Sequence, residues 1–378
     1  MVLRQTGNVQ PAPSAPPLSD GKALQTPADS GDLVIVDHFQ PTSPDSAPHG
    51  QVIHTTVQDE GFSGKVLERF ELPATLRPED AKGDTSDQFC SSLERKVSSW
   101  QSQVLNNEAG ELRTLAASGL HDGAVNFSSG CSQARVVWGL YTTALHEPTS
   151  DTPEQQADHA RLMDQYSKAF HFDPTKLVGA DNDASHARGL FLQGLCDLVK
   201  QGEADPDFMA AKVNYDKAVA DISKKSVSVV VAAENSGSDL AQYSEASGGQ
   251  KLNLAPDFFK NPLASADTVT VGSVGGADRS AKAPESISDF NSPERDDILA
   301  NGVTTDPISG DDDEGTSFAA PRVAAALAKV HSDHPGMADR DALGYLLAND
   351  THPLNGDASK AVLDADKTAQ LLGGPQTG

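Results

Sequence analysis

The sequence has few cysteines, few positive charges and no long apolar run. Its three cysteines, Cys90, Cys131 and Cys196, are odd in number and widely spaced. They indicate neither a disulfide framework nor a cysteine-based metal site, and a reduced compartment is the simplest interpretation. The net charge of −25 argues against nucleic-acid binding and against attraction to anionic membranes, and it favours basic partners or substrates. No apolar run reaches the length of about 18 residues that predicts a transmembrane helix.

The first residues also lack the apolar segment of a secretory signal peptide. Residues 1–30 are rich in proline and small polar side chains, which cannot bury enough surface to fold, so we expect a disordered leader. We expect one folded domain over residues 31–372 and a flexible tail over 373–378. The expected location is the cytoplasm, or outside the cell by a route without a cleaved secretory signal peptide.

The most informative stretch is Gly-Thr-Ser-Phe-Ala-Ala-Pro, from Gly315 to Pro321, followed by an alanine-rich segment. We interpret it as a nucleophile at the start of a helix. Gly315 leaves room for a close approach, and free N–H groups near Ser317 favour a developing negative charge. We expect Pro321 to be tolerated because a first-turn residue has no intrahelical N–H bond to lose. The alternative, an ordinary capped core helix, is not excluded by this stretch alone.

An acid and a histidine precede that stretch at informative places. The run from Asp32 to Asp37 predicts a buried parallel strand that ends in a carboxylate, at the sheet edge where catalytic groups gather. After a loop with several prolines, the segment from His49 to Val57 predicts a helix whose first turn carries the histidine. The alternatives are a turn-capping aspartate and a solvated histidine.

Two further strands end in polar turns. The apolar run that ends at Ala232 and Ala233 predicts a buried parallel strand, followed by Glu234 and Asn235. A second strand is predicted from Ala124 to Phe127, followed by Ser-Ser-Gly at 128–130. Each could be a plain buried strand with its turn.

The rest of the chain predicts a mixed α/β domain. Strands are expected at 65–72, 268–274 and 298–303, and helices at 87–118 (one or two), 315–332, 339–349 and 359–372. Residues 133–225 are mostly helical, with an insertion at about 139–205. Helical periodicity extends over Arg135 to Leu145, Pro153 to Phe170, Ala184 to Lys200 and Pro206 to Ser223. Neither the acidic run 311–314 nor the pair Asp181 and Asp183 completes a calcium loop.

In this order, the four stretches resemble the motifs of the subtilisin-like serine peptidases, above all the pattern Gly-Thr-Ser-x-Ala-x-Pro. The resemblance implies an α/β fold, a three-layer subtilisin-like architecture with a mostly parallel central sheet flanked by helices. It implies an Asp37, His49 and Ser317 triad and an oxyanion donor at Asn235. The substrate-binding positions that it implies are Asn126, Ser128, Gly130, Ala232 and Glu234.

Three residues depart from the family's usual pattern: His38 after the acid, Gln51 after the His-Gly pair, and Glu234 where glycine is usual. Because the family's pocket for the side chain before the scissile bond lies near that last position, we expect Glu234 to favour arginine or lysine there.

The expected function is a serine endopeptidase that hydrolyses peptide bonds through an acyl-enzyme. The alternative is a subtilase-fold protein that binds extended peptides without cleaving them, as an effector or scaffold. A sedolisin-like peptidase is disfavoured, because Asn235 and His49 stand where it would need other groups. The expected partner is a polypeptide, with no nucleic acid and no membrane. No cofactor is required, structural calcium is unsupported, and the oligomeric state is not predicted.

Overall fold

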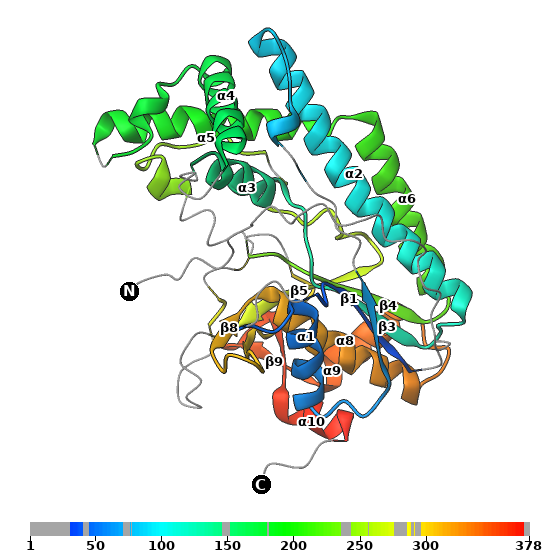
Figure 1. The fold of residues 1–378 in the computed structure, drawn as a ribbon. Helices are drawn as coiled ribbons and strands as arrows, with labels where there is room; N and C mark the ends of the chain where they lie inside the picture. The colour runs from blue at the N-terminus through cyan, green and yellow to red at the C-terminus, as the bar shows by residue number, and fades with distance from the viewer. Residues whose placement is uncertain are drawn as a thin grey trace.

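The computed structural model describes residues 31–40, 45–70, 76, 78–145, 152–179, 181–235, 243–255, 257–275, 286–288, 291 and 296–373. The predicted leader and all but the first residue of the predicted tail lie outside these residues. In the described part, an eight-stranded sheet has helices on both of its faces (Figure 1). The expected α/β fold with a mostly parallel central sheet is confirmed.

The sheet has the strand order β2-β1-β3-β4-β5-β6-β10-β9. All neighbours pair in parallel except β10 and β9, which are antiparallel. These strands are β1 (Leu33–Asp37), β2 (Val66–Phe70), β3 (Gly123–Phe127), β4 (Val227–Ala232), β5 (Thr268–Val274), β6 (Ile298–Asn301), β9 (Thr351–Leu354) and β10 (Asp357–Leu363). A separate antiparallel hairpin consists of β7 (Val303–Thr305) and β8 (Asp312–Glu314).

Side chains of β1 alternate between two apolar cores, as the pleat of a strand buried on both faces requires. Leu33 and Ile35 join the core on the face covered by α1 (His49–Asp59), α8 (Thr316–Asp333), α9 (Asp339–Asn349) and α10 (Ala365–Leu372). Val34 and Val36 join the core under α2 (Ser86–Ser118) and α6 (Pro206–Ser223) on the other face. The sheet is therefore the middle of three layers.

The range of the predicted insertion, residues 139–205, contains most of α3 (Gln133–Leu145) together with α4 (Pro153–Phe170), the short 3-10 turn Pro174–Lys176 and α5 (Asn182–Gly202). Another 3-10 turn, Pro78–Asp80, precedes α2. Helices α3, α4 and α5 lie together beyond the sheet in Figure 1 and have an apolar core of their own. That core also contains Phe89, Leu93 and Val97 from the first half of α2. The long helix α2 is a single helix, and it joins the insertion to the sheet.

One predicted helix is wrong. Residues 359–372 were expected to be helical, but the first part of that range lies in β10, and α10 begins only at Ala365. Strand β9, which the sequence analysis did not predict, pairs with β10. The N-cap of α10 is Asp364, whose carboxylate accepts the N–H of Lys367. That capped start explains where the helix begins.

Candidate active site

Three predicted residues from three separate elements meet at the carboxyl edge of the sheet. His49 Nδ1 lies 2.9 and 3.0 Å from the two carboxylate oxygens of Asp37, and His49 Nε2 lies 3.1 Å from Ser317 Oγ. Because the carboxylate can only accept, Nδ1 carries the proton and Nε2 is free to accept the serine hydroxyl. Asp37 is 1 % exposed, whereas the His49 side chain is 39 % exposed, so the imidazole remains open to a ligand.

Opposing effects act on the imidazole of His49. Desolvation lowers its pKa, but the charge of Asp37 and its hydrogen bond raise it, with a further contribution from the charge of Asp313. Arg135 opposes them weakly, and the net pKa lies above the ordinary value of 6.5. The surroundings therefore favour the imidazolium, which is the form that a general base adopts after taking a proton.

The departures beside Asp37 and His49 are accommodated by the backbone. The N–H of His38 donates to Asp37 Oδ1 at 2.6 Å, and its carbonyl accepts the N–H of Gly50 at 2.9 Å. Gln51 is exposed. Gly50 is required for space, because a Cβ there would lie 2.8 Å from the ring of Phe39. The backbone of His38 therefore contacts both the acid and the start of the histidine helix.

The nucleophile stretch differs from the sequence-based expectation at Pro321. This proline is the sixth residue of α8, beyond the first turn, so its missing N–H leaves the carbonyl of Ser317 without an intrahelical donor. Ser128 Oγ donates to that carbonyl at 3.0 Å and accepts from Asn126 Nδ2 at 2.8 Å. Two of the residues predicted to bind substrate therefore act on the nucleophile segment: Ser128 holds the main chain of Ser317, and Asn126 holds Ser128.

Asn235 is oriented by the residue that precedes the serine. Its Oδ1 accepts both the N–H and the hydroxyl of Thr316, at 2.9 and 3.0 Å, so its Nδ2 must face the other way. A Cβ on Gly315 would lie 3.2 Å from this Nδ2 and 2.9 Å from Ser317 Oγ. Glycine therefore leaves open a space that both atoms border, next to the first-turn N–H of Ser317.

The predicted substrate-binding residues differ in exposure. Asn126 and Ala232 are buried, and the carbonyl of Ala232 accepts Asn261 Nδ2 at 2.9 Å. Gly130 is partly exposed. It lies against Glu234, because a Cβ there would be 2.1 Å from Glu234 Oε1.

Glu234 is placed differently from the expectation of a carboxylate that faces a substrate side chain. It is 5 % exposed. Its Oε1 accepts the N–H of Ser132 at 2.8 Å and its Oε2 accepts the Ser132 hydroxyl, just before α3. Burial raises its pKa, and Arg135 opposes this. Its φ of 71° lies in the left-handed region, which explains why glycine suits this position. Glu234 thus anchors the first helix of the insertion.

The fold also brings together a second serine, histidine and aspartate. Ser228 Oγ lies 2.9 Å from His331 Nε2 and donates to Asp339 Oδ1. Ser228 and His331 are both 0 % exposed. Here the serine contacts both other groups, so the histidine does not lie between the acid and the hydroxyl. This set is a buried polar contact between β4, α8 and the start of α9, closed to a substrate.

The acidic run 311–314 falls partly in strand β8, and Asp181 is the N-cap of α5. Across the described residues, no group of three or more histidine, cysteine, aspartate or glutamate side chains could hold a metal ion. In the same part of the chain, no helix is long and apolar enough to cross a membrane.

Comparison with known proteins finds similarity to one family. Residues 198–365 match the model of the subtilase family. This range includes Asn235 and Ser317 and leaves out Asp37 and His49, which the fold brings to them. Over these residues the chain is similar to the subtilases. A search of curated protein sequences gave no match.

The solved structures that the chain matches include several subtilisin-like enzymes. A cold-adapted subtilisin-like serine proteinase is 14% identical, with a TM-score of 0.35, over 89% of this chain and 91% of its own. The epidermin leader peptide processing serine protease of Staphylococcus aureus is 15% identical, with a TM-score of 0.39, over 90% of this chain and 74% of its own. The nisin leader peptidase of Lactococcus lactis is 14% identical, with a TM-score of 0.39, over 92% of this chain and 89% of its own.

Sequence reasoning missed several residues around this site. Thr316, which orients Asn235, belongs to the Gly-Thr-Ser motif, but the motif alone does not indicate this contact. The role of the Ser128 hydroxyl could have been sought from Pro321, since a proline inside a helix frees one carbonyl. The proximity of Asp313 to His49 has no signal in the sequence.

Proposed function

We propose that this protein is a subtilase and a serine endopeptidase that hydrolyses peptide bonds through an acyl-enzyme. The observation that carries the proposal is the position of His49, which lies within hydrogen-bond distance of both Asp37 and Ser317. Ser317 Oγ attacks the scissile carbonyl while His49 Nε2 takes its proton. The bond from carbon to Oγ forms, and the carbonyl electron pair moves to the oxygen.

The oxyanion lies in the space that Gly315 leaves open. Asn235 Nδ2 and the N–H of Ser317 donate to it, and Asp37 stabilises the imidazolium of His49. His49 then returns the proton to the leaving amine as the peptide bond breaks. Water, deprotonated by His49, releases the acyl group and regenerates the serine. Each proton transfer uses side chains of this chain, and none requires a cofactor.

The substrate is a polypeptide in extended form along residues 128–130. Ser129 and Gly130 are partly exposed and directly follow Ser128, whose hydroxyl donates to the main chain of the nucleophile, whereas the preceding strand is buried. Strand addition of this kind gives affinity through main-chain hydrogen bonds. The acidic surface of the chain favours basic substrates.

The test is covalent labelling of Ser317 by a fluorophosphonate. Wild type should be labelled, and Ser317→Ala should not. His49→Ala should react more slowly by several orders of magnitude, because the hydroxyl loses its base. Asn235→Ala should keep the labelling site but lower kcat for peptide hydrolysis by about 10²–10³. A folded wild type that stays unlabelled and cleaves no peptide would contradict the proposal and favour a peptide-binding protein.

A further inference from the structure

The contact between His49 and Ser317 depends on how two helices lie against each other. His49 is the first residue of α1 and Ser317 the second residue of α8, and the two helices pack side by side. Apolar side chains of α1, among them Val52, Ile53 and Val57, join the core that α8 also fills. Apolar packing is non-directional, so it leaves the orientation of α1 to other contacts.

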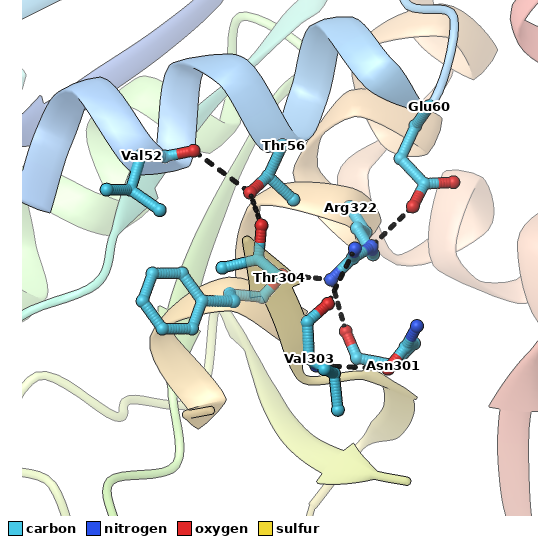
Figure 2. A network of polar contacts seen from close by, with 8 residues as sticks. Val52, Thr56, Glu60, Asn301, Val303, Thr304 and Arg322 are labelled. Carbon is cyan, nitrogen blue, oxygen red and sulfur yellow. Dashed lines mark hydrogen bonds and ion pairs between the residues drawn. The ribbon is translucent and has the colours of Figure 1, made fainter. Parts of the chain in front are cut away.

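A buried arginine of α8 connects both helices to the segment between β6 and β7. Arg322 Nε donates to Glu60 Oε1 at 2.5 Å, and Glu60 is the C-cap of α1. Its Nη1 donates to the carbonyls of Asn301 and Phe318 at 2.6 and 3.0 Å, and its Nη2 donates to that of Val303 at 3.0 Å. Figure 2 shows Arg322 beside Glu60, Asn301 and Val303. The side chains of the pair are only 10 % and 21 % exposed.

The β7–β8 hairpin contacts the segment around α1 at two more places. Thr304 of β7 shares a hydrogen bond of 2.7 Å with Thr56, whose hydroxyl donates to the carbonyl of Val52 at 2.9 Å (Figure 2). After β7, the carboxylate of Asp306 accepts the N–H of Ala47 at 3.1 Å, two residues before His49. The same hairpin ends at Glu314, directly before the nucleophile motif. It therefore connects the histidine segment with the serine segment.

Arg322 contacts the end of α1 opposite to His49, so a small change in the tilt of the helix displaces the histidine. Glu60 follows His49 by eleven residues along the chain, which is about 16 Å of helix. A tilt of about 4° around that end moves the first residue of α1 by about 1 Å, and a displacement of this size can cost about 10²-fold in rate. A buried ion pair is weak evidence for stability, because desolvation offsets its attraction. Its directional contacts, however, fix an orientation.

We propose that Arg322 is a positioning residue, which orients α1 on α8 through Glu60 and the β6–β7 segment and so holds His49 against Ser317. The inference rests on the proposed peptidase function. Lysine keeps the charge at this position but lacks the planar fork that serves four acceptors.

Arg322→Lys should lower kcat and the rate of fluorophosphonate labelling by about tenfold to a hundredfold, with KM little changed. Glu60→Gln retains an acceptor for Arg322 Nε and should keep most of the activity, whereas Glu60→Ala should resemble Arg322→Lys. The matched control is Arg69→Lys, because Arg69 forms a comparably buried pair with Glu111 on the α2 side of the sheet. It should lose stability and keep the rate per folded molecule.

A second measurement does not need turnover. In an NMR titration, the pKa of the His49 imidazole should fall in Arg322→Lys, because its contact with Asp37 loosens. Labelling of Arg322→Lys at the wild-type rate with an unchanged His49 titration would overturn the inference and leave the proposed function standing. Equal losses in Arg69→Lys at equal loss of stability would also overturn it. An unlabelled wild type contradicts the proposed function, and the titration then decides the positioning role by itself.

Discussion

Removing the Ser128 hydroxyl tests how the nucleophile is held. In Ser128→Ala the carbonyl of Ser317 loses its donor, because Pro321 has no N–H to offer, and Asn126 Nδ2 loses its acceptor. Asn126 is 0 % and Ser128 8 % exposed, so water does not readily replace these bonds. A buried polar group left without a partner costs about 1–3 kcal/mol. We expect the free energy of unfolding to fall by about 2–3 kcal/mol and the labelling of Ser317 to slow.

A double-mutant cycle with Pro321→Ala makes this prediction specific. Alanine restores an N–H that can donate to the carbonyl of Ser317, so Ser128→Ala should cost less in that background by about 1–2 kcal/mol. Urea unfolding followed by circular dichroism measures the four free energies. Ser129→Ala is the matched control, because the buried hydroxyl of Ser129 has no hydrogen-bond partner in the described structure, and it should be nearly neutral. The same cost in both backgrounds would refute the assigned role of Ser128.

Two further predictions concern pH. Because the charge of Asp313 contributes to raising the pKa of His49, Asp313→Asn should lower that pKa, and the acidic limb of the activity profile should move to lower pH. Burial raises the pKa of Asp339 to about 6, against the hydrogen bond from Ser228. The contribution of this group to stability is therefore present below its unfolded pKa of 3.8 and lost as the pH rises through about 6. The free energy of unfolding of Asp339→Asn, taken relative to that of wild type, should rise by about 2 kcal/mol from pH 4 to pH 7.5. Urea unfolding at both pH values measures this difference.

Each of these variants has a control. Asp312→Asn removes a charge from the neighbouring position of β8, whose side chain points to the other face of the hairpin, and it should move the activity profile less. A profile that moves upward, or equally in both variants, would exclude the effect of Asp313. For Asp339, Asp341→Asn in the same first turn of α9 controls for the helix dipole. A stability difference from wild type that stays constant across the pH range would contradict the buried carboxylate.

Much of the fold could be predicted from periodicity alone. The boundaries of α4 and α6 agree with the predicted helices, because proline and capping residues mark where each helix begins. The prediction failed near the C-terminus, where β10 is exposed over its first residues and has little apolar pattern. Its strand conformation comes from pairing with β9 and β6. These pairings join separate segments of the chain, so the local sequence does not show them.

For the site, the sequence determined which residue types are present and where the strands and helices place them. Asp37 ends a strand, His49 and Ser317 open helices, and Asn235 follows a strand. These positions follow from local patterns, and parallel strands bring their carboxyl ends to one edge. Local patterns therefore placed these residues at the ends of strands and the starts of helices, and the resemblance of their motifs to those of the subtilisin-like peptidases predicted that they meet.

Only the tertiary structure decided what surrounds them. It turned Glu234 inward to Ser132, gave Ser128 the carbonyl that Pro321 leaves free, and set Arg322 between the two helices. Each of these contacts joins residues from about 100 to about 260 positions apart. Local propensity carries no information about such partners, because a hydrogen bond depends on distances and angles that packing alone fixes.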